Sequence, residues 1–236
     1  MLDSLNLKQV LFLDIETVPQ KPAFNELPEE FKKLWDKKSS FFRKDEQEAA
    51  DVYERAGIYA EFGKIICISV GAVTGERDNY GFKLKSFYGD DEVKLLSEFY
   101  EMVEKLNHTK QLRFCAHNGK EFDYPYLSRR MLINKVKLPD ILDIAGKKPW
   151  EVNHLDTLEL WKFGDYKHYT SLDLLTHVFD IPSPKQDIDG SMVARVFYEE
   201  KDLEKIKVYC EHDVVAVAQL LMRYMGLPLI ESIIYS

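Results

Sequence analysis

Two carboxylates, Asp14 and Glu16, stand at the end of an apolar run over residues 9–15. The run is rich in Val, Leu, Phe and Ile, which predicts a buried central strand. Alternate residues of a strand point to the same face, so the two carboxylates would lie side by side. Like charges are costly to bury unless a cation neutralises them, and oxygen ligands suit Mg²⁺ or Mn²⁺. The pair therefore predicts a metal site, and the alternative is two solvated acids at a strand end.

A second candidate lies where a predicted strand over residues 112–116 ends and a helix begins near Glu121. Asp123 falls in the first turn of that helix, where the helix dipole favours an anion. The segment from His117 to Asp123 could thus bring another carboxylate to the metal site. In the alternative interpretation, Asn118 caps the helix and Asp123 only complements its dipole.

A third candidate is the pair Tyr209 and Asp213 in a long C-terminal helix. Residues four apart share a helix face, so the two side chains would lie together. A carboxylate at the edge of the core again requires a partner. The alternative is a tyrosine packed on the sheet beside an exposed aspartate. The inward stripe of this helix is marked by Ile206, Cys210, Val217 and Leu221.

A mixed sheet with helices on both faces would position these groups, because strands come first in the chain and then alternate with helices. The predicted strands cover residues 9–15, 63–73, 81–88, 112–116 and 154–157. The predicted helices cover residues 90–107 and 121–134, and the chain from 171 onward is helical, broken at Pro182 and Pro184, with a last helix over 203–225. We expect one domain over residues 1–236.

Residues 19–61 differ from the rest and predict an insertion between the first two strands. Three prolines break the chain there, at Pro19, Pro22 and Pro28. Two charged, amphipathic helices are expected after them, over residues 29–38 and 45–60.

Composition excludes several classes of protein. The 236 residues contain 32 Lys+Arg and 40 Asp+Glu, a net charge of −8, which disfavours coating of DNA by bulk charge but permits an enzyme that meets phosphates through metal ions. No apolar run approaches the length of a membrane span, and the start of the chain lacks the pattern of a signal peptide. The three cysteines are far apart, as in reduced proteins. We therefore expect a cytoplasmic protein without membrane contact.

The three motifs together resemble those of the DEDD exonucleases of the Tyr subtype: an acidic pair on the first strand, N-x3-F-D after a later strand, and Y-x3-D in a C-terminal helix. More specifically, the chain resembles bacterial proteins related to the proofreading exonuclease domain of family-B DNA polymerases. The similarity covers most of the chain except the insertion. It is carried by the stretches LFLDIETVP, EFGKIICISVG, AHNGKEFDYPYLSRR, SLDLLTHVFDIPSPKQDIDGSMV and YCEHDVVAVAQLL.

The resemblance implies an α/β, ribonuclease H-like fold with a mixed five-stranded sheet. It also implies hydrolysis of phosphodiesters from the 3′ end of single-stranded DNA with two Mg²⁺ or Mn²⁺ ions. By motif, Asp14, Glu16 and Asp213 would bind the first ion. Asp14 would also bridge to the second ion, which Asp123 would reach directly or through water. Tyr209 would orient the attacking water.

The same resemblance assigns substrate contacts. Asn118 and Phe122 would shape the substrate cleft, and Thr17 would lie beside the terminal nucleotide. Weaker candidates are Asp156 as support for the metal site, Lys185 as a phosphate contact, and an aromatic and basic segment that could stack on bases. That segment comprises Trp161, Lys162, Phe163, Tyr166, Lys167, His168 and Tyr169.

The final acidic residue has a competitor. A sister subtype places His five residues before the last Asp, and His168 with Asp173 fits that pattern. Val208 stands at the corresponding place before Asp213, as the Tyr subtype requires. We favour Asp213 because it lies in a long C-terminal helix and its surroundings match the family.

Two other functions are open. The stretch from Asp14 to Thr17 resembles the D-x-D-x-T nucleophile motif of haloacid-dehalogenase-like phosphatases, but its second acid is Glu and no convincing G-D-x3-D motif follows. A non-catalytic nucleic-acid-binding module with a degenerate site is the other alternative. Acidic residues at all four positions disfavour it.

Overall fold

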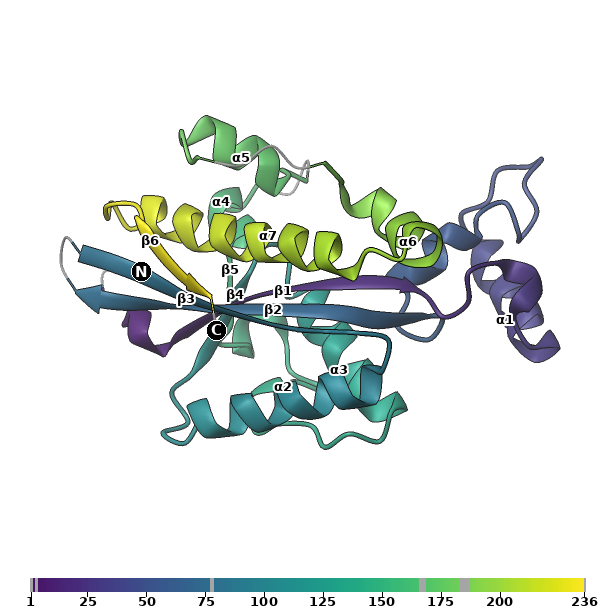
Figure 1. Ribbon diagram of the computed structural model, residues 1–236, viewed down its shortest axis with the longest axis horizontal. Coiled ribbons are helices and arrows are strands. Elements are labelled where there is room, and N and C mark those ends of the chain that lie inside the picture. The colour runs from purple at the N-terminus through teal and green to yellow at the C-terminus, as the bar shows by residue number, and fades with distance from the viewer. Residues whose placement is uncertain (1, 3, 77–78, 166–168, 183–186, 236) are drawn as a thin grey trace.

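A mixed six-stranded sheet forms the centre of the molecule (Figure 1). The computed structural model describes residues 2, 4–76, 79–165, 169–182 and 187–235. The strand order is β5-β4-β1-β2-β3-β6; β1–β2 and β2–β3 are antiparallel, whereas β1–β4, β4–β5 and β3–β6 are parallel. The strands are β1 (Val10–Pro19), β2 (Gly63–Glu76), β3 (Asn79–Tyr88), β4 (Arg113–Ala116), β5 (Leu155–Asp156) and β6 (Ser232–Tyr235).

Helices cover both faces of this sheet, as expected (Figure 1). On one face, α7 packs on Val10 and Phe12 of β1, and on the other face α2 and α3 pack on Leu13 and Ile15. The alternation of apolar side chains along β1 thus fills two separate cores. The helices are α1 (Glu29–Ser39), α2 (Glu92–Leu106), α3 (Asp123–Ile133), α4 (Thr157–Lys162), α5 (Leu172–Val178), α6 (Val193–Arg195) and α7 (Leu203–Tyr224), and a π-helical turn, η7 (Val196–Glu200), follows α6.

The long helix α7 forms where its apolar stripe predicted it. Its first turn is capped by Asp202, whose side chain accepts a hydrogen bond from the Lys205 amide at 3.0 Å. The predicted inward residues are all buried: Ile206, Cys210, Val217 and Leu221. None of the helices in the described part of the chain is both long enough and apolar enough to span a membrane.

The insertion projects beyond one end of the sheet (Figure 1) and contains only one of its two predicted α-helices. Residues 29–39 form α1, but the helix expected over 45–60 is wrong: turns lead to a 3-10 helix, η3 (Tyr53–Ile58). The reason is Trp35, which is fully buried at the centre of an aromatic cluster. Its indole donates to the Ala49 carbonyl at 2.8 Å, so the segment wraps around the ring instead of forming a helical ladder.

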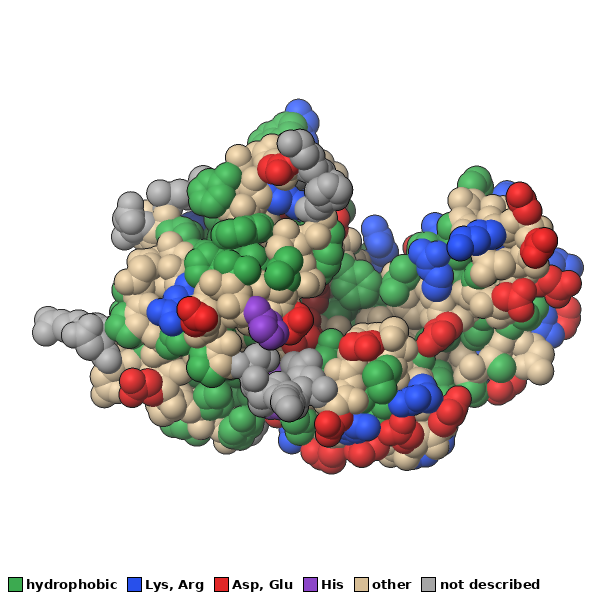
Figure 2. All heavy atoms as spheres, turned by 90° about the horizontal axis from the view of Figure 1, so that it is seen from above, with side chains coloured by type: hydrophobic (Ala, Val, Ile, Leu, Met, Phe, Trp, Pro, Cys, Tyr) green, Lys and Arg blue, Asp and Glu red, His purple; other side chains and the backbone are tan. Residues whose placement is uncertain are grey.

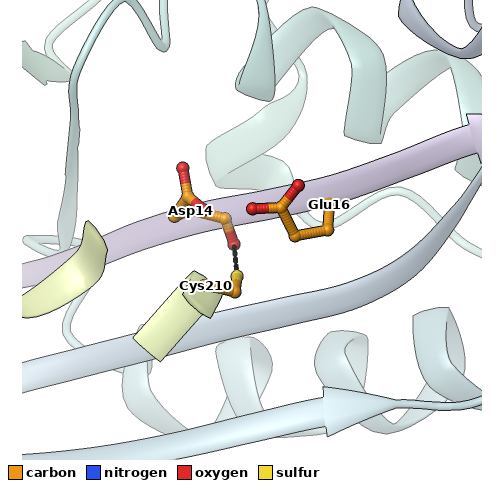
Figure 3. A group of neighbouring side chains, drawn as sticks. All are labelled: Asp14, Glu16 and Cys210. Carbon is orange, nitrogen blue, oxygen red and sulfur yellow. Dashed lines mark hydrogen bonds between the residues drawn. The ribbon is translucent and has the colours of Figure 1, made fainter. Parts of the chain in front are cut away.

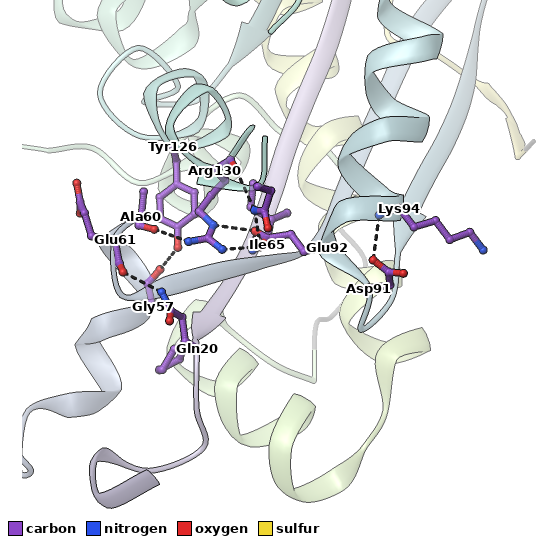
Figure 4. Close-up of polar contacts among 12 residues, drawn as sticks. Gln20, Gly57, Ala60, Glu61, Ile65, Asp91, Glu92, Lys94, Tyr126 and Arg130 are labelled. Atoms are coloured by element: carbon purple, nitrogen blue, oxygen red, sulfur yellow. Dashed lines mark hydrogen bonds and ion pairs between the residues drawn. The ribbon is translucent and has the colours of Figure 1, made fainter. Parts of the chain in front are cut away.

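The C-terminal end of the insertion is hydrogen-bonded to the main body. The Tyr126 hydroxyl of α3 donates to the Gly57 carbonyl at 2.7 Å, and the Gln20 side chain donates to the Glu61 carbonyl at 2.8 Å (Figure 4). These bonds join it to α3 and to the end of β1.

The sixth strand is the other departure from the predicted sheet. β6 pairs in parallel with residues 81–84 of β3, where five strands were expected. The tail that leads to it is held by Gln219, whose side chain both donates to the Ile230 carbonyl and accepts from the Ile230 amide, each at 2.9 Å.

Candidate functional site

Asp14 and Glu16 lie on the face of β1 that α7 covers, as strand alternation predicted (Figure 3). Their partners on β2 are Ser69 and Cys67. β1 continues beyond the pair, with a register shift between Glu16 and Thr17, so the two acids lie within the strand and not at its end. Glu16 is only 7% exposed, whereas the Asp14 side chain is half-buried.

Helix α7 brings further groups against this pair. The Cys210 thiol donates to the Asp14 carbonyl at 3.5 Å, and its sulfur and one carboxylate oxygen each of Asp14 and Glu16 all lie within 4.8 Å of one another (Figure 3). Tyr209 and Asp213 stand on the same helix, half-buried, and are joined by a side-chain hydrogen bond. Asp213 is close enough to Asp14 to raise its pKa by charge repulsion.

Asp123 reaches the same place from the opposite face of the sheet. It is the first residue of α3. The pairing of β4 with β1 stops at Phe12, which leaves the adjoining edge of β1 open. The Asp123 carboxylate accepts a hydrogen bond from the Ile15 backbone, and its charge raises the pKa of Asp14. The structure therefore brings the four predicted acids together from three elements.

The loop before α3 is held by Asp156, a residue that the sequence indicated only weakly. Asp156 is 3% exposed, and its carboxylate accepts from the amides of Asn118 at 3.0 Å, Lys120 at 3.1 Å and Leu158 at 3.0 Å. It thereby caps α4 and fixes the loop that leads to Asp123. The first residue of α3 has no side-chain cap, so Asn118 does not cap that helix; it instead adopts a φ of 64° in the loop.

The predicted substrate residues lie beside the acids. Thr17 follows Glu16 on β1, and Phe122 directly precedes α3; both are half-buried, as is Asn118. Thr17 hydrogen-bonds the Tyr126 hydroxyl, and the Phe122 ring lies 5.3 Å from the Tyr126 ring. Tyr126 thus links two of the three predicted substrate contacts.

Burial and mutual repulsion dominate the electrostatics of the cluster. Burial is the largest cause that raises the pKa of Asp14, Glu16 and Asp123, and it brings that of Asp123 to about 7. The next causes are the charges of Asp123 and Asp213 on Asp14, and the charge of Asp14 on Glu16. The pKa of Tyr209 is also raised, first by burial and then by Asp213.

The donor set fits divalent cations. The Oδ2 atom of Asp14 is buried and has no hydrogen-bond partner among the described residues, as expected of an atom meant for a metal ion. Carboxylate oxygens are the ligands of Mg²⁺ and Mn²⁺. Burial raises the pKa of the Cys210 thiol, which stays protonated and so is not a ligand for such ions.

The competing candidate for the last acidic residue and the aromatic segment occupy different places. Asp173 lies on α5 with its side chain 81% exposed, paired with His177 at 3.5 Å. Trp161 is half-buried and packs against Phe179 and Tyr224, and its stacking on bases stays a prediction. By contrast, the pKa of Tyr169 is raised by burial and then by four aspartates, among them Asp123 and Asp213, so this residue adjoins the cluster. Tyr166, Lys167, His168, Pro184 and Lys185 lie outside the described residues.

Comparisons with known proteins show the family and the fold of this chain. A family model described as "Predicted 3'-5' exonuclease related to the exonuclease domain of PolB" matches residues 58–228. Asp123, Tyr209 and Asp213 fall inside this range, whereas Asp14 and Glu16 precede it. A search of curated protein sequences gave no match.

Among solved structures, the family B DNA polymerase from the hyperthermophilic archaeon Pyrobaculum calidifontis is similar, with a TM-score of 0.55 and 14% identity over 92% of this chain and 24% of the polymerase chain. The chain thus spans about a quarter of the length of that polymerase. This likeness confirms the expected α/β, ribonuclease H-like fold. Since the family match spans most of the chain, the protein belongs to the predicted 3′–5′ exonucleases related to the exonuclease domain of PolB.

Proposed function

We propose that this protein is a metal-dependent exonuclease that hydrolyses phosphodiester bonds from the 3′ end of single-stranded DNA, with two Mg²⁺ or Mn²⁺ ions. The observation that carries the proposal is the meeting of Asp14, Glu16, Asp123 and Asp213, which repel one another in a buried site. Such a cluster is costly unless cations compensate it. Membership of an exonuclease family supports the same conclusion.

The carboxylates would divide the ions between them. Asp14, Glu16 and Asp213 would hold the first, and Asp14 with Asp123 would hold the second. When bound, the cations activate the attacking water and stabilise the charge on the leaving 3′ oxygen. The hydrogen bonds from the Ile15 and Asp123 amides to the Asp123 carboxylate keep that ligand oriented.

Tyr209 would orient the water and would not remove its proton. Its raised pKa keeps the phenol protonated at neutral pH. The hydroxyl donates to Asp213 and retains a lone pair that can accept a hydrogen bond from the attacking water. A water held between this hydroxyl and the cluster is restricted in orientation, which favours in-line attack.

The test is the release of mononucleotides from a 3′-labelled oligonucleotide with Mg²⁺ or Mn²⁺, run in parallel on single- and double-stranded DNA and RNA. Asp213→Ala should abolish release. Asp173→Ala is the matched control, because that side chain is exposed and outside the cluster, and it should retain most activity. The opposite ranking of the two variants would contradict the assignment.

Two outcomes would replace the proposal. Binding of a 3′ end without release of nucleotides, under several metals that support a control nuclease, would favour a non-catalytic module. Hydrolysis of phosphate monoesters with trapping of Asp14 by beryllium fluoride would favour the phosphatase.

A further inference from the structure

A cavity of about 670 Å³ lies beyond the acidic cluster, where the insertion meets the end of β1 and the segment formed by α6 and η7. Phe24 and Tyr53 of the insertion form one side, and Pro19, Arg195 and Tyr198 form the other. Figure 2 shows the surface hollowed between the main body and the projecting insertion, with hydrophobic and acidic side chains on the floor. The cavity is separate from the four carboxylates, none of which lines it.

The Tyr53 hydroxyl is the unexplained group in this cavity. Tyr53 is 4% exposed, and its hydroxyl oxygen has no hydrogen-bond partner of normal geometry among the described residues. The Lys21 amide lies near enough to oppose the rise that burial causes in the pKa of the phenol. A buried hydroxyl whose hydrogen bonding is incomplete is costly, so its position beside a cavity points to an occupant that brings a further polar group within reach.

The walls of the cavity are fixed before anything binds. The Tyr198 hydroxyl donates to the Pro19 carbonyl at 2.5 Å, which holds η7 against the end of β1. On the insertion side, the Phe24 ring packs edge-on against the Tyr53 ring at 6.0 Å, and Tyr53 packs in turn against buried Trp35 at 5.9 Å. A preformed aromatic cavity binds a planar group without the entropic cost of ordering its walls.

The lining selects the chemistry of the occupant. Glu54 and Glu199 line the cavity together with Arg195, whose guanidinium pairs with Glu200 at 3.3 Å; this lining disfavours phosphate and suits an uncharged ring with N–H donors. Two further cations lie against the Tyr198 ring: the Lys64 and Lys201 ammonium groups are each 5.8 Å from its centroid. Aromatic walls with basic groups beside them are the arrangement that binds the bases and backbone of a single strand.

The cavity is within reach of the acidic cluster along one strand. Pro19 is three residues beyond Glu16 on β1, a span of about 10 Å at the rise of a strand. A stacked strand advances about 3.4 Å per nucleotide, so this span corresponds to a few nucleotides. We infer that this cavity binds a base of the single-stranded substrate a few nucleotides from the 3′ end, an inference that rests on the proposed function.

The experiment is a scan of single-stranded DNA oligonucleotides that carry one abasic site at successive positions from the 3′ end. Affinity is measured by fluorescence anisotropy without divalent cations, so that no hydrolysis is needed. With the unaltered protein, one internal position should weaken binding about fivefold or more, since one stacked base contributes at least that much. A scan without such a position would overturn the inference.

Three variants test whether the loss of affinity at that abasic position arises in this cavity. Tyr53→Phe removes only the hydroxyl, and Ala50→Trp places a large side chain in the cavity from an exposed position that lines it. Both should reduce the penalty at that one position, Ala50→Trp the more strongly. Leu34→Trp is the matched control on the same insertion, since Leu34 is 53% exposed and does not line the cavity, and it should behave as the unaltered protein. A position effect that both cavity variants leave intact would place the base elsewhere.

The two proposals fail differently. A protein that releases nucleotides but gives a flat scan retains the proposed function and loses this inference. A protein that gives the position effect but releases no nucleotide loses the proposed exonuclease activity, while the base-binding cavity stands. Melting temperatures of the three variants show whether each is folded.

Discussion

Asp123→Asn is expected to make the metal-free protein more stable while it abolishes hydrolysis. The substitution keeps the size of the side chain and an acceptor oxygen for the Ile15 amide. It removes one negative charge from a site where burial, Asp156 and Asp213 all disfavour that charge.

The magnitude follows from the pKa of Asp123, which is about 7 against an ordinary value of 3.8. The difference of about 3 units corresponds to roughly 4 kcal/mol when the carboxylate is fully ionised. This is an upper bound, because neighbouring acids share the repulsion and water relaxes it. We expect a gain of about 1–4 kcal/mol at pH 8, at about 2–4 °C of melting temperature per kcal/mol for a protein of this size.

The raised pKa of Asp123 determines at which pH the variant should be more stable than the unaltered protein. An acid whose pKa is raised on folding stabilises the folded state below its unfolded value and loses that contribution as the pH rises through its folded value. The advantage of Asp123→Asn should therefore be largest above pH 7 and should vanish near pH 4. Thermal unfolding followed by circular dichroism in EDTA from pH 4 to pH 8 measures it. Added Mn²⁺ should then stabilise the unaltered protein more than the variant.

The control is Asp173→Asn, whose side chain is exposed and whose stability should stay within about 0.5 kcal/mol of that of the unaltered protein at every pH. If Asp123→Asn melts at a lower temperature than the unaltered protein at pH 8 in EDTA, hydrogen bonding outweighs repulsion at this position. The reasoning would also be refuted by a gain that persists unchanged at pH 4.

Three further substitutions test how the site is supported. Asp156→Ala should lower stability by about 2 kcal/mol, because the cap of α4 and the acceptor for two loop amides are lost, and should lower kcat in the oligonucleotide assay. Glu92→Ala should cost about 3–5 kcal/mol in urea unfolding, since it leaves the Arg130 guanidinium buried without its partner at 2.5 Å (Figure 4), with kcat of the folded protein preserved. Gly119→Ala should cost about 1–3 kcal/mol in the same measurement, because its added carbon would lie 2.5 Å from the Ala116 side chain.

The elements that the sequence predicted are those whose pattern is local. Alternation along β1 placed Leu13 and Ile15 on one face and Asp14 and Glu16 on the other. The helical spacing of α7 predicted its buried face, as Ile206 and Cys210 show. These periods depend only on near neighbours, so they can be read without tertiary structure.

The features that escaped prediction depend on distant contacts. The segment over residues 45–60 has helical spacing, but the burial of Trp35 determines its path. β6 is too short to be recognised without its partner β3. The role of Asp156 depends on amides of a loop far away in the chain, around Asn118, which no spacing reveals. The motifs identified the acids, whereas their meeting from both faces of a sheet required the fold.

The early end of β4 has a consequence for how such sites can be altered or transplanted. A sheet ordinarily separates the side chains of its two faces. Here the sheet is interrupted beside β1, because β4 ends early and the Ile15 amide donates a hydrogen bond to the Asp123 side chain, from the opposite layer, in place of a neighbouring strand. Extending β4 by even a few residues would continue its pairing with β1 and displace the Asp123 side chain. The shortness of this strand is therefore a requirement of the proposed metal site, and a scaffold designed for regular sheets alone would exclude such a site.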